Sequence, residues 1–241
     1  MIVNGDDDLL CTLKIVAPPF KVKQFGSELN FDCGLVNEDE SIDSVRFTAY
    51  VNDKKEEFTI PVPGFHNVYN AMSAILAGVE LGIEMDSIKK GLEQFKATSM
   101  RQEVIKTAKY TIINDAYNAS SDSMFAALSV LSKAEGRKVA ILGDMFELGE
   151  YSEKAHRETG KSAALRADVV IAIGKDAKYI YQEARINGLL SDAHYFQTKE
   201  ECIENLDNII KDGDTVLVKA SRGMYLEKIV EYLVEMGGKN E

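Results

Sequence analysis

The sequence predicts an α/β protein of two unlike parts: antiparallel strands plus two helices, and then a mostly parallel sheet with helices on both faces. Two observations carry this prediction. Short apolar runs separated by polar turns fill residues 9–61, whereas after residue 100 apolar runs alternate with helical patterns. Closely spaced strands form antiparallel meanders, and strands that alternate with helices form parallel sheets.

The first part contains four strand candidates, which read LLCTLKIV, LNFDCGLV, SVRFTAYV and EFTIPV. Polar stretches such as NEDES and NDKKEE separate them as turns. Apolar residues then recur at helical spacing over residues 68–79, and the pattern stops at Gly82. A second helix follows, with Asp86 as its expected N-cap. Its apolar face is formed by Ile88, Leu92 and Phe95.

The second part contains five strand candidates, which read YTIIND, KVAILG, DVVIAIG, AHYFQ and TVLVKA. Short and nearly all-apolar strands are typical of a parallel sheet that is covered on both faces. The segments between them, including SMFAALSVLSKAEG and KYIYQEARING, have helical patterns. Asp122 or Ser123 is the expected cap of the helix from Met124, and Thr198 with Glu201 predicts a capping box.

Composition and charge argue against several classes of function. The chain has 241 residues and a net charge of −11, whereas nucleic-acid binding requires clustered Lys and Arg. No apolar run approaches the roughly 20 residues of a membrane span. The three cysteines and three histidines are scattered along the chain. We therefore expect free thiols, and neither a disulfide framework nor a metal site.

One motif imitates a nucleotide-binding loop. The segment AHRETGKS ends in Gly-Lys-Ser like a P-loop, but Ala155 stands where the first glycine is required. The segment also lies within a helical pattern and follows no strand, so its backbone N–H groups would not be exposed to a phosphate. We interpret it as a helix surface.

Polar loops follow three of the predicted parallel strands. They read NDAYN after TII, GDMFELGE after VAIL and KASRG after TVLV. Ligands of such sheets bind beyond the carboxyl ends of the strands, so these loops predict a site. Lys219, Ser221 and Arg222 form a candidate anion site. Asp144 and Glu147 are either a paired acid and base or part of a helix-starting loop.

Isolated polar residues elsewhere are ambiguous by themselves. Asn67 and Asn70 are three residues apart, hence on one helix face. An Asn cap after the Pro-Gly turn explains one of them, whereas an amide pair also suits the edge of a purine base. Arg101 is equally well explained as a solvated charge, and Asp115 as a turn residue.

In combination these segments resemble one known family. GFHNVYNAMSAILAG, the Arg101 segment, NDAYNASSDSM, ILGDMFELGE with HRE, and VLVKASRGMYLEKIV occur in an order and spacing similar to those of the Mur ligases, the amide ligases of peptidoglycan synthesis. The opening IVNGDDDLL resembles their central domain, and the resemblance covers nearly the whole chain. LGDMFELGE and VLVKASRGM are most similar to the branch that adds D-alanyl-D-alanine to UDP-N-acetylmuramoyl-tripeptide.

The resemblance implies a domain organisation. Residues 1–98 would be the C-terminal part of the ATP-binding central domain, and residues 99–241 the Rossmann-like C-terminal domain. The family's P-loop, its Mg²⁺-binding glutamate and histidine and its modified lysine would all precede Met1. We therefore expect a fragment without ligase activity of its own, from a monomeric enzyme of the bacterial cytoplasm. ATP and Mg²⁺ would be bound mainly by the missing N-terminal half.

The resemblance also implies roles for individual residues. Asn70 would meet the adenine, Arg101 the ATP phosphates and Asp115 the ribose hydroxyls. Ser120-Ser121 and Ala220 depart from the family's usual Asn-Pro and Gly. No catalytic residue and no metal ligand is assigned within this chain. The full prediction is nucleotide binding by His66, Asn67, Asn70, Arg101 and Asp115, and substrate binding by Tyr117, Asn118, Asp144, Ser221 and Arg222.

The implied reaction is ATP-dependent amide formation through an acyl phosphate of the tripeptide, which the amine of D-alanyl-D-alanine attacks. Two alternatives stay open. One is an amide ligase similar to folylpolyglutamate synthase, against which LGDMFELGE argues. The other is a non-catalytic binding module with a Rossmann-like fold, and the coding sequence upstream of Met1 would discriminate it from a ligase.

Overall fold

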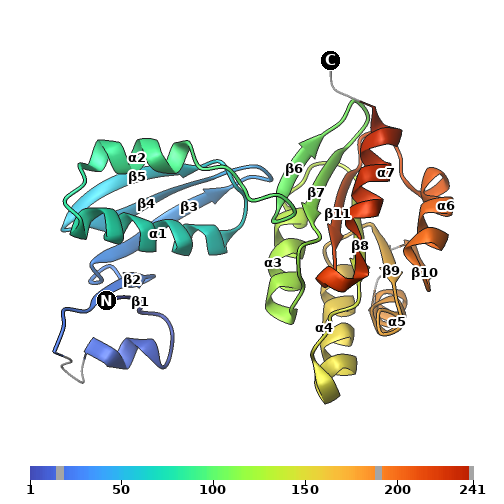
Figure 1. Cartoon of the computed structure of the whole chain (residues 1–241), viewed down its shortest axis with the longest axis horizontal. Helices are drawn as coiled ribbons and strands as arrows, with labels where there is room; N and C mark the ends of the chain where they lie inside the picture. The colour runs from blue at the N-terminus through green and yellow to red at the C-terminus, as the bar shows by residue number, and fades with distance from the viewer. Residues whose placement is uncertain (15–18, 188–191, 239–241) are drawn as a thin grey trace. The chain divides into compact units, whose positions relative to one another are not determined.

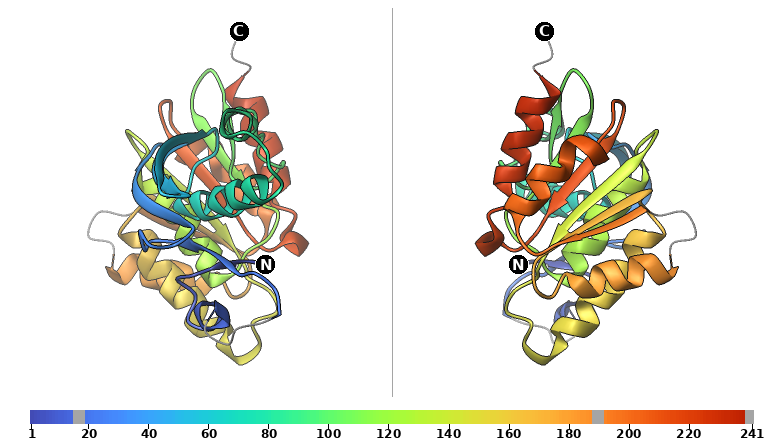
Figure 2. Two further views of the ribbon diagram at one scale, coloured as in Figure 1. Left: turned by 90° about the vertical axis from the view of Figure 1, so that its left-hand side faces the viewer. Right: turned by 90° about the vertical axis from the view of Figure 1, so that its right-hand side faces the viewer.

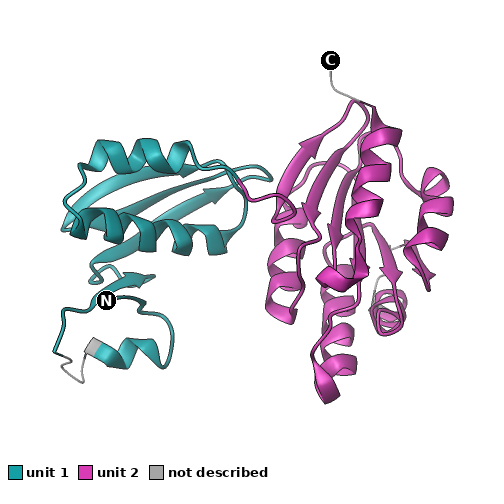
Figure 3. Ribbon diagram, in the orientation of Figure 1, with its two compact units in different colours: residues 1–96 teal, residues 97–241 magenta. Residues whose placement is uncertain are grey.

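The computed structural model describes residues 1–14, 19–187 and 192–238. The chain divides into two compact units, residues 1–96 and 97–241 (Figure 3). Each unit combines helices with a sheet of its own, and the second sheet is mostly parallel, which confirms the predicted fold class (Figure 1). The assignment of residues 1–98 and 99–241 to particular ligase domains stays a prediction.

The first unit has a five-stranded sheet in the order β1-β2-β3-β4-β5. β3, β4 and β5 pair antiparallel as predicted, but β1, β2 and β3 pair parallel, so the prediction of a purely antiparallel meander was wrong. The bounds are β1 (Ile2–Asn4), β2 (Lys23–Gly26), β3 (Cys33–Glu40), β4 (Val45–Val51) and β5 (Lys54–Ile60).

The predicted strand over residues 9–16 is a second correction. Its described part forms a 3-10 helix, η1 (Leu10–Lys14), and residues 15 and 16 lie outside the described residues. The Asp7 carboxylate accepts hydrogen bonds from the N–H groups of Leu9 (3.0 Å) and Leu10 (2.9 Å). An acidic side chain that binds the N–H groups two and three residues ahead starts a helical turn, which outweighs the strand-like composition.

Two helices complete the first unit, α1 (Phe65–Glu80) and α2 (Met85–Glu93). α1 confirms the helix predicted over residues 68–79. The N-cap of α2 is Glu84 rather than Asp86, which lies in the first turn, and Phe95 lies beyond the helix and is 50% exposed. The buried face of α1 consists of Val68, Ala71, Met72, Ile75, Leu76 and Gly78.

The second unit has a six-stranded sheet in the order β10-β9-β8-β11-β7-β6 (Figure 1). All pairs are parallel except β6 with β7. The five predicted strands are confirmed, and β6 is an additional strand at the edge of the sheet. The bounds are β6 (Glu103–Lys106), β7 (Thr111–Asp115), β8 (Lys138–Gly143), β9 (Val169–Ile173), β10 (Asp192–Phe196) and β11 (Thr215–Lys219).

Helices cover both faces of this sheet, as predicted (Figure 2). One apolar cluster joins the sheet to α6 and α7, and a separate cluster joins it to α3, α4 and α5. Short 3-10 helices, η2 (Gly149–Tyr151) and η3 (Arg222–Met224), follow β8 and β11. The bounds are α3 (Ser121–Ser132), α4 (Ser152–Ala164), α5 (Lys178–Asn187), α6 (Lys199–Ile209) and α7 (Glu227–Gly237).

Helix caps in the second unit differ partly from expectation. α3 begins three residues before Met124, with Ser120 as its N-cap, and Ser123 returns the bond in a capping box. Thr198 caps α6 by accepting from the Glu201 N–H at 3.2 Å, as predicted. The Glu201 carboxylate, however, accepts from the Gln197 N–H rather than from Thr198. Ser120 therefore has a structural role that the sequence comparison left unexplained.

The P-loop imitation lies within α4, as interpreted from the sequence. Gly160 serves packing: a Cβ at this position would lie 2.5 Å from the Ile180 carbonyl oxygen on α5. Gly160 is thus required because α4 and α5 approach closely there, not because it binds a phosphate.

Candidate functional site

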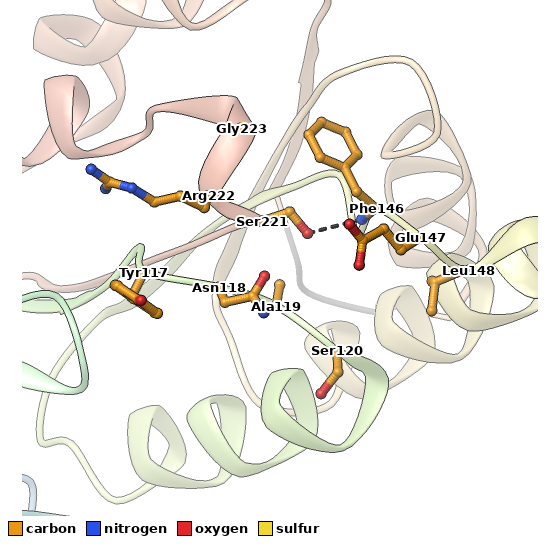
Figure 4. Close-up of a pocket in the computed structure, with 10 residues that line it drawn as sticks. All are labelled: Tyr117, Asn118, Ala119, Ser120, Phe146, Glu147, Leu148, Ser221, Arg222 and Gly223. Carbon is orange, nitrogen blue, oxygen red and sulfur yellow. Dashed lines mark hydrogen bonds between the residues drawn. The ribbon is translucent and has the colours of Figure 1, made fainter.

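Three loops meet at the carboxyl edge of the second sheet. They follow β7, β8 and β11, which are neighbours in the sheet, and together they form a pocket of about 470 Å³ (Figure 4). The pocket therefore lies where a parallel sheet binds its ligands. Its lining consists of Tyr117, Asn118, Ala119 and Ser120 from the first loop, Phe146, Glu147 and Leu148 from the second, and Ser221, Arg222 and Gly223 from the third.

A buried ion pair fixes the first loop to the third. The Lys219 ammonium lies 2.6 Å from an Asp115 carboxylate oxygen and donates to the Asn118 carbonyl oxygen at 2.9 Å. The Lys219 side chain is only 2% exposed. Lys219 was predicted to contribute to an anion site, but its charge is buried and engaged by Asp115, so it holds the loops together.

Ser221 connects the third loop to the second. Its hydroxyl accepts a hydrogen bond from the Phe146 N–H at 2.8 Å, and its own N–H donates to the Asp144 carbonyl oxygen at 3.0 Å (Figure 4). The Phe146 ring packs against Gly223, where an added Cβ would lie 2.8 Å from a ring carbon. The side chain of Phe146, which is 44% exposed, is thereby placed on the pocket wall.

Asp144 has a different role from the predicted one. It is buried, and its carboxylate accepts from the N–H groups of Lys175 (3.0 Å), Asp176 (3.0 Å) and Ala177 (2.7 Å). These donors form the turn between β9 and α5. Asp144 is not among the residues that line the pocket. Its placement therefore supports a structural role, the capping of this turn, rather than substrate contact.

Arg222 and Arg101 place two guanidinium groups beside the first loop. Arg222 forms an ion pair with Glu227 at 3.0 Å, and its side chain is 51% exposed. The Arg101 guanidinium stacks on the Tyr117 ring at 4.0 Å from the ring centroid. Met100 and Gln102, on either side of Arg101, both have left-handed backbone angles, with φ of 64° and 51°. Such strain in non-glycine residues is often associated with function.

Asp115 lies behind these groups, at the end of β7. Besides the Lys219 ammonium, its carboxylate accepts the Gln102 N–H at 3.2 Å. These two bonds fix the Asp115 carboxylate between Lys219 of the third loop and the segment that contains Arg101.

The remaining predicted residues belong to the first unit, at the start of α1. The N-cap there is Gly64, which makes no side-chain bond, so the expected Asn cap was wrong. Asn67 instead donates to the Pro63 carbonyl oxygen at 2.6 Å and accepts from the Asn70 amide at 3.2 Å. Asn70 and His66 are exposed. Asn67 thus orients the exposed side-chain amide of Asn70.

Sequence reasoning missed part of the pocket wall. Glu147 was weighed only as the partner of Asp144, and Phe146, Leu148 and Ser120 were not considered as ligand contacts. Glu147 adopts a φ of 64°, in the left-handed region. Because the residue at this position is not a glycine, the local sequence gives no signal of that conformation. The position of Glu147 on the pocket wall depends on contacts between loops that are distant in the sequence.

Two further properties concern possible partners. Within the described ranges, no three His, Cys, Asp or Glu side chains are grouped so that they could bind a metal ion. Over the same part of the chain, no helix has the length and apolar character needed to cross a membrane.

Comparisons with known proteins agree on one family. Residues 100–222 match the model described as "Mur ligase, glutamate ligase domain". The chain is 37% identical over 239 residues to UDP-N-acetylmuramoyl-tripeptide–D-alanyl-D-alanine ligase of Bacillus subtilis (strain 168), covering 98% of this chain and 51% of that protein. It is 32% identical over 241 residues to the Escherichia coli (strain K12) enzyme of the same name, covering 98% and 52%.

Solved structures give the same result. A crystal structure of MurF from Acinetobacter baumannii matches with a TM-score of 0.86 and 30% identity over 97% of this chain and 51% of that one. MurF ligase from Thermotoga maritima in complex with ADP matches with a TM-score of 0.81 and 24% identity over 97% and 52%, which shows a shared fold. The chain spans about half the length of the relatives it matches.

Proposed function

The chain belongs to the Mur ligase family, and on that premise we propose that it is part of the ATP-dependent ligase that joins D-alanyl-D-alanine to UDP-N-acetylmuramoyl-tripeptide. The 37% identity with the B. subtilis enzyme over almost the whole chain carries this proposal. The proposed role of the chain is to contact adenosine and to bind the dipeptide. Residues 1–98 would belong to the central domain and residues 99–241 to the C-terminal domain of a monomeric cytoplasmic enzyme.

The proposed nucleotide contacts of the first unit lie at the start of α1. Asn70 presents an amide that can both donate to and accept from the edge of adenine, and Asn67 orients it. His66, next to Asn67, is exposed at the same helix start. ATP, with Mg²⁺, would supply the phosphoryl group that activates the tripeptide carboxylate. We assign the metal no ligand in this chain.

Arg101 and Asp115 complete the proposed nucleotide contacts. Stacking on Tyr117 orients the flat Arg101 guanidinium and leaves its N–H edge accessible for charge-assisted bonds to phosphate. Asp115 would accept the ribose hydroxyls, and the ion pair with Lys219 fixes the position of its carboxylate at the end of β7.

The proposed dipeptide site is the pocket between the three loops. Tyr117, Asn118, Ser221 and Arg222 line it, and its volume of about 470 Å³ accommodates two small residues. Of the five predicted substrate residues, Asp144 is withdrawn from this proposal because its carboxylate caps the turn after β9. Arg222 is the group best suited to bind the dipeptide carboxylate, since a guanidinium can bind a carboxylate with two parallel hydrogen bonds.

The test is phosphate release from ATP by the full-length protein. We expect release that requires both UDP-N-acetylmuramoyl-tripeptide and D-alanyl-D-alanine, and none from the 241-residue chain alone. Arg222→Ala in the full-length protein should raise the KM for the dipeptide at least tenfold and leave the KM for ATP unchanged, because a charge-assisted bond contributes ~1.5–3 kcal/mol. Release with L-glutamate and a folate instead would favour the folylpolyglutamate synthase-like alternative. No release with any amine would favour a non-catalytic module.

A further inference from the structure

Glu147 is a pocket carboxylate with no partner of its own. Its side chain lies on the pocket wall, and no hydrogen bond or ion pair joins it to another described residue. Of the two other acids of the same loop, Asp144 is buried and accepts three backbone N–H bonds, and Glu150 is exposed but does not line the pocket. Glu147 is therefore the acid of the GDMFELGE loop that is available to a ligand.

The backbone holds Glu147 in this position at a cost. Its φ of 64° is left-handed, a strained conformation that a non-glycine residue keeps only where the surroundings enforce it. The backbone N–H groups of the two preceding residues, Met145 and Phe146, are hydrogen-bonded to residues outside this loop. The Met145 N–H donates to the buried His156 ring at 3.0 Å, and the Phe146 N–H donates to the Ser221 hydroxyl at 2.8 Å. These bonds direct the chain so that residue 147 turns toward the pocket.

Arg222 gives the pocket the opposite charge. In Figure 4 the Arg222 and Glu147 side chains lie on either side of Ser221. The ion pair with Glu227 uses the Nη1 atom of Arg222, so the Nε and Nη2 donors remain for a ligand. The pocket thus offers a cation and an anion at separate places on its wall, which suits a ligand that carries both charges.

We propose that Glu147 binds the ammonium group of a small zwitterionic dipeptide whose carboxylate pairs with Arg222. An extended dipeptide spans ~7 Å, and its α-amino group, with a pKa of ~7.7–8.0, is largely protonated at pH 7. The identity of the dipeptide as D-alanyl-D-alanine rests on the proposed function. The pairing of charges makes Glu147 a specificity-determining residue that selects a free amino terminus.

The experiment is an NMR titration of the 241-residue chain with D-alanyl-D-alanine and with N-acetyl-D-alanyl-D-alanine, which lacks the ammonium. The variants are Glu147→Gln and, as a control with the same change of charge, Glu150→Gln, because Glu150 is exposed and does not line the pocket. Glu147→Gln should raise the Kd of the dipeptide roughly tenfold and leave the Kd of the acetylated peptide unchanged. Glu150→Gln should change neither, and unchanged amide spectra outside the loop would show that both variants fold.

Two outcomes would overturn the inference alone. Equal affinity of the unaltered chain for both peptides would show that the ammonium is not bound. An equal loss of both affinities in Glu147→Gln would indicate a steric effect rather than charge pairing. Binding of neither peptide would overturn the dipeptide pocket itself, whereas the phosphate-release test of the proposed reaction would still stand independently.

Discussion

The two units of the chain bury their sheets in different ways. In the first unit, Val45, Phe47, Ala49 and Val51 of β4 are buried, but Arg46 between them is exposed. In the second unit, β9 (Val169–Ile173) and β11 (Thr215–Lys219) are buried at every position. Separate apolar clusters lie on the two faces of that sheet. The apolar side chains of β4 thus lie on one face, where they are buried, whereas Arg46, Thr48 and Tyr50 on the other face are exposed, buried and half-buried in turn. The second sheet has an apolar core on both faces.

Side-chain capping of the helix N-termini also differs between the two units. α3 and α6 of the second unit begin with Ser120 and Thr198, whose side chains accept backbone N–H bonds. α4 and α7, like α1 and α2 of the first unit, begin at residues that make no such bond, so the side-chain caps that are described belong to two helices of the second unit. Because a larger unit also buries a larger fraction of its surface, the second unit should be the more stable one. A site that must position small ligand groups is best built on such a rigid base.

The largest expected effect is a difference in unfolding free energy between the two units. It can be measured through the reactivity of one buried cysteine in each unit. Cys33 of the first unit and Cys202 of the second are both fully buried, and burial raises the pKa of each thiol to about 12. At ~0.1 kcal/mol per residue, units of residues 1–96 and 97–241 should differ by about 5 kcal/mol in unfolding free energy. In rising urea, iodoacetamide should therefore modify Cys33 well before Cys202, as followed by peptide mass spectrometry. Modification of both at the same urea concentration would show that the units unfold together.

Lys219→Met should abolish most of this difference. It leaves the buried Asp115 carboxylate without its ion-pair partner at 2.6 Å, which typically costs ~3–5 kcal/mol. Cys202 should then be modified at nearly the same urea concentration as Cys33, whose own labelling should not change. Lys228→Met is the matched control, because the pair of Lys228 with Glu231 is exposed and screened by solvent, so its loss should leave the labelling of both cysteines unchanged.

A double variant separates the charge from the volume of the lysine. Adding Asp115→Asn to Lys219→Met removes the uncompensated charge, so part of the lost stability should return. If the double variant has a lower unfolding free energy than Lys219→Met, the uncompensated charge of Asp115 is not the cause of the stability lost in Lys219→Met.

The same contrast explains how much of the fold the sequence could predict. Strands that are buried on both faces are continuous apolar runs, so β7, β8, β9 and β11 were evident from composition alone. In the first unit the parallel pairing of β2 with β3 rests on only two residue pairs and on contacts between distant segments. The close spacing of the strand candidates predicted an antiparallel meander, and that spacing did not reveal that β1, β2 and β3 pair in parallel.

The candidate site was predictable in position but not in detail. Three polar loops after parallel strands placed it at the right edge of the sheet. Whether Asp144 or Glu147 faces the pocket, however, depends on the backbone N–H groups of residues 175–177, about thirty residues further along the chain. These donors take the Asp144 carboxylate, and no local property of GDMFELGE reveals it.

The smallest expected effect is the change in stability as the pH falls. Asp6 in the first unit and Asp214 in the second should change the unfolding free energy in opposite directions. Burial pushes the pKa of Asp6 upward, but hydrogen bonds from Tyr69 (2.6 Å) and Ser27 (2.7 and 2.8 Å) hold it below its usual value. A lowered folded pKa gives stability that is present above the unfolded pKa of ~3.9 and is lost as the pH falls through the folded value. In the second unit, burial raises the pKa of Asp214 despite its ion pair with Arg137, so this group instead favours folding as the pH falls.

Acidification from pH 7 toward pH 3 should therefore widen the gap in stability between the units. Urea titrations followed by NMR would measure it, with the amides of β4 reporting on the first unit and those of β9 on the second. Asp6→Asn should be less stable than the unaltered chain at pH 7, because the amide loses the charge-assisted bonds. That deficit should shrink as the pH falls below the unfolded pKa of ~3.9 toward the lowered folded pKa, because the unaltered Asp6 also becomes protonated over that range. A deficit that stays constant with pH would mean that Asp6 acts through packing, and the first unit's sensitivity to acid would then have to come from other groups.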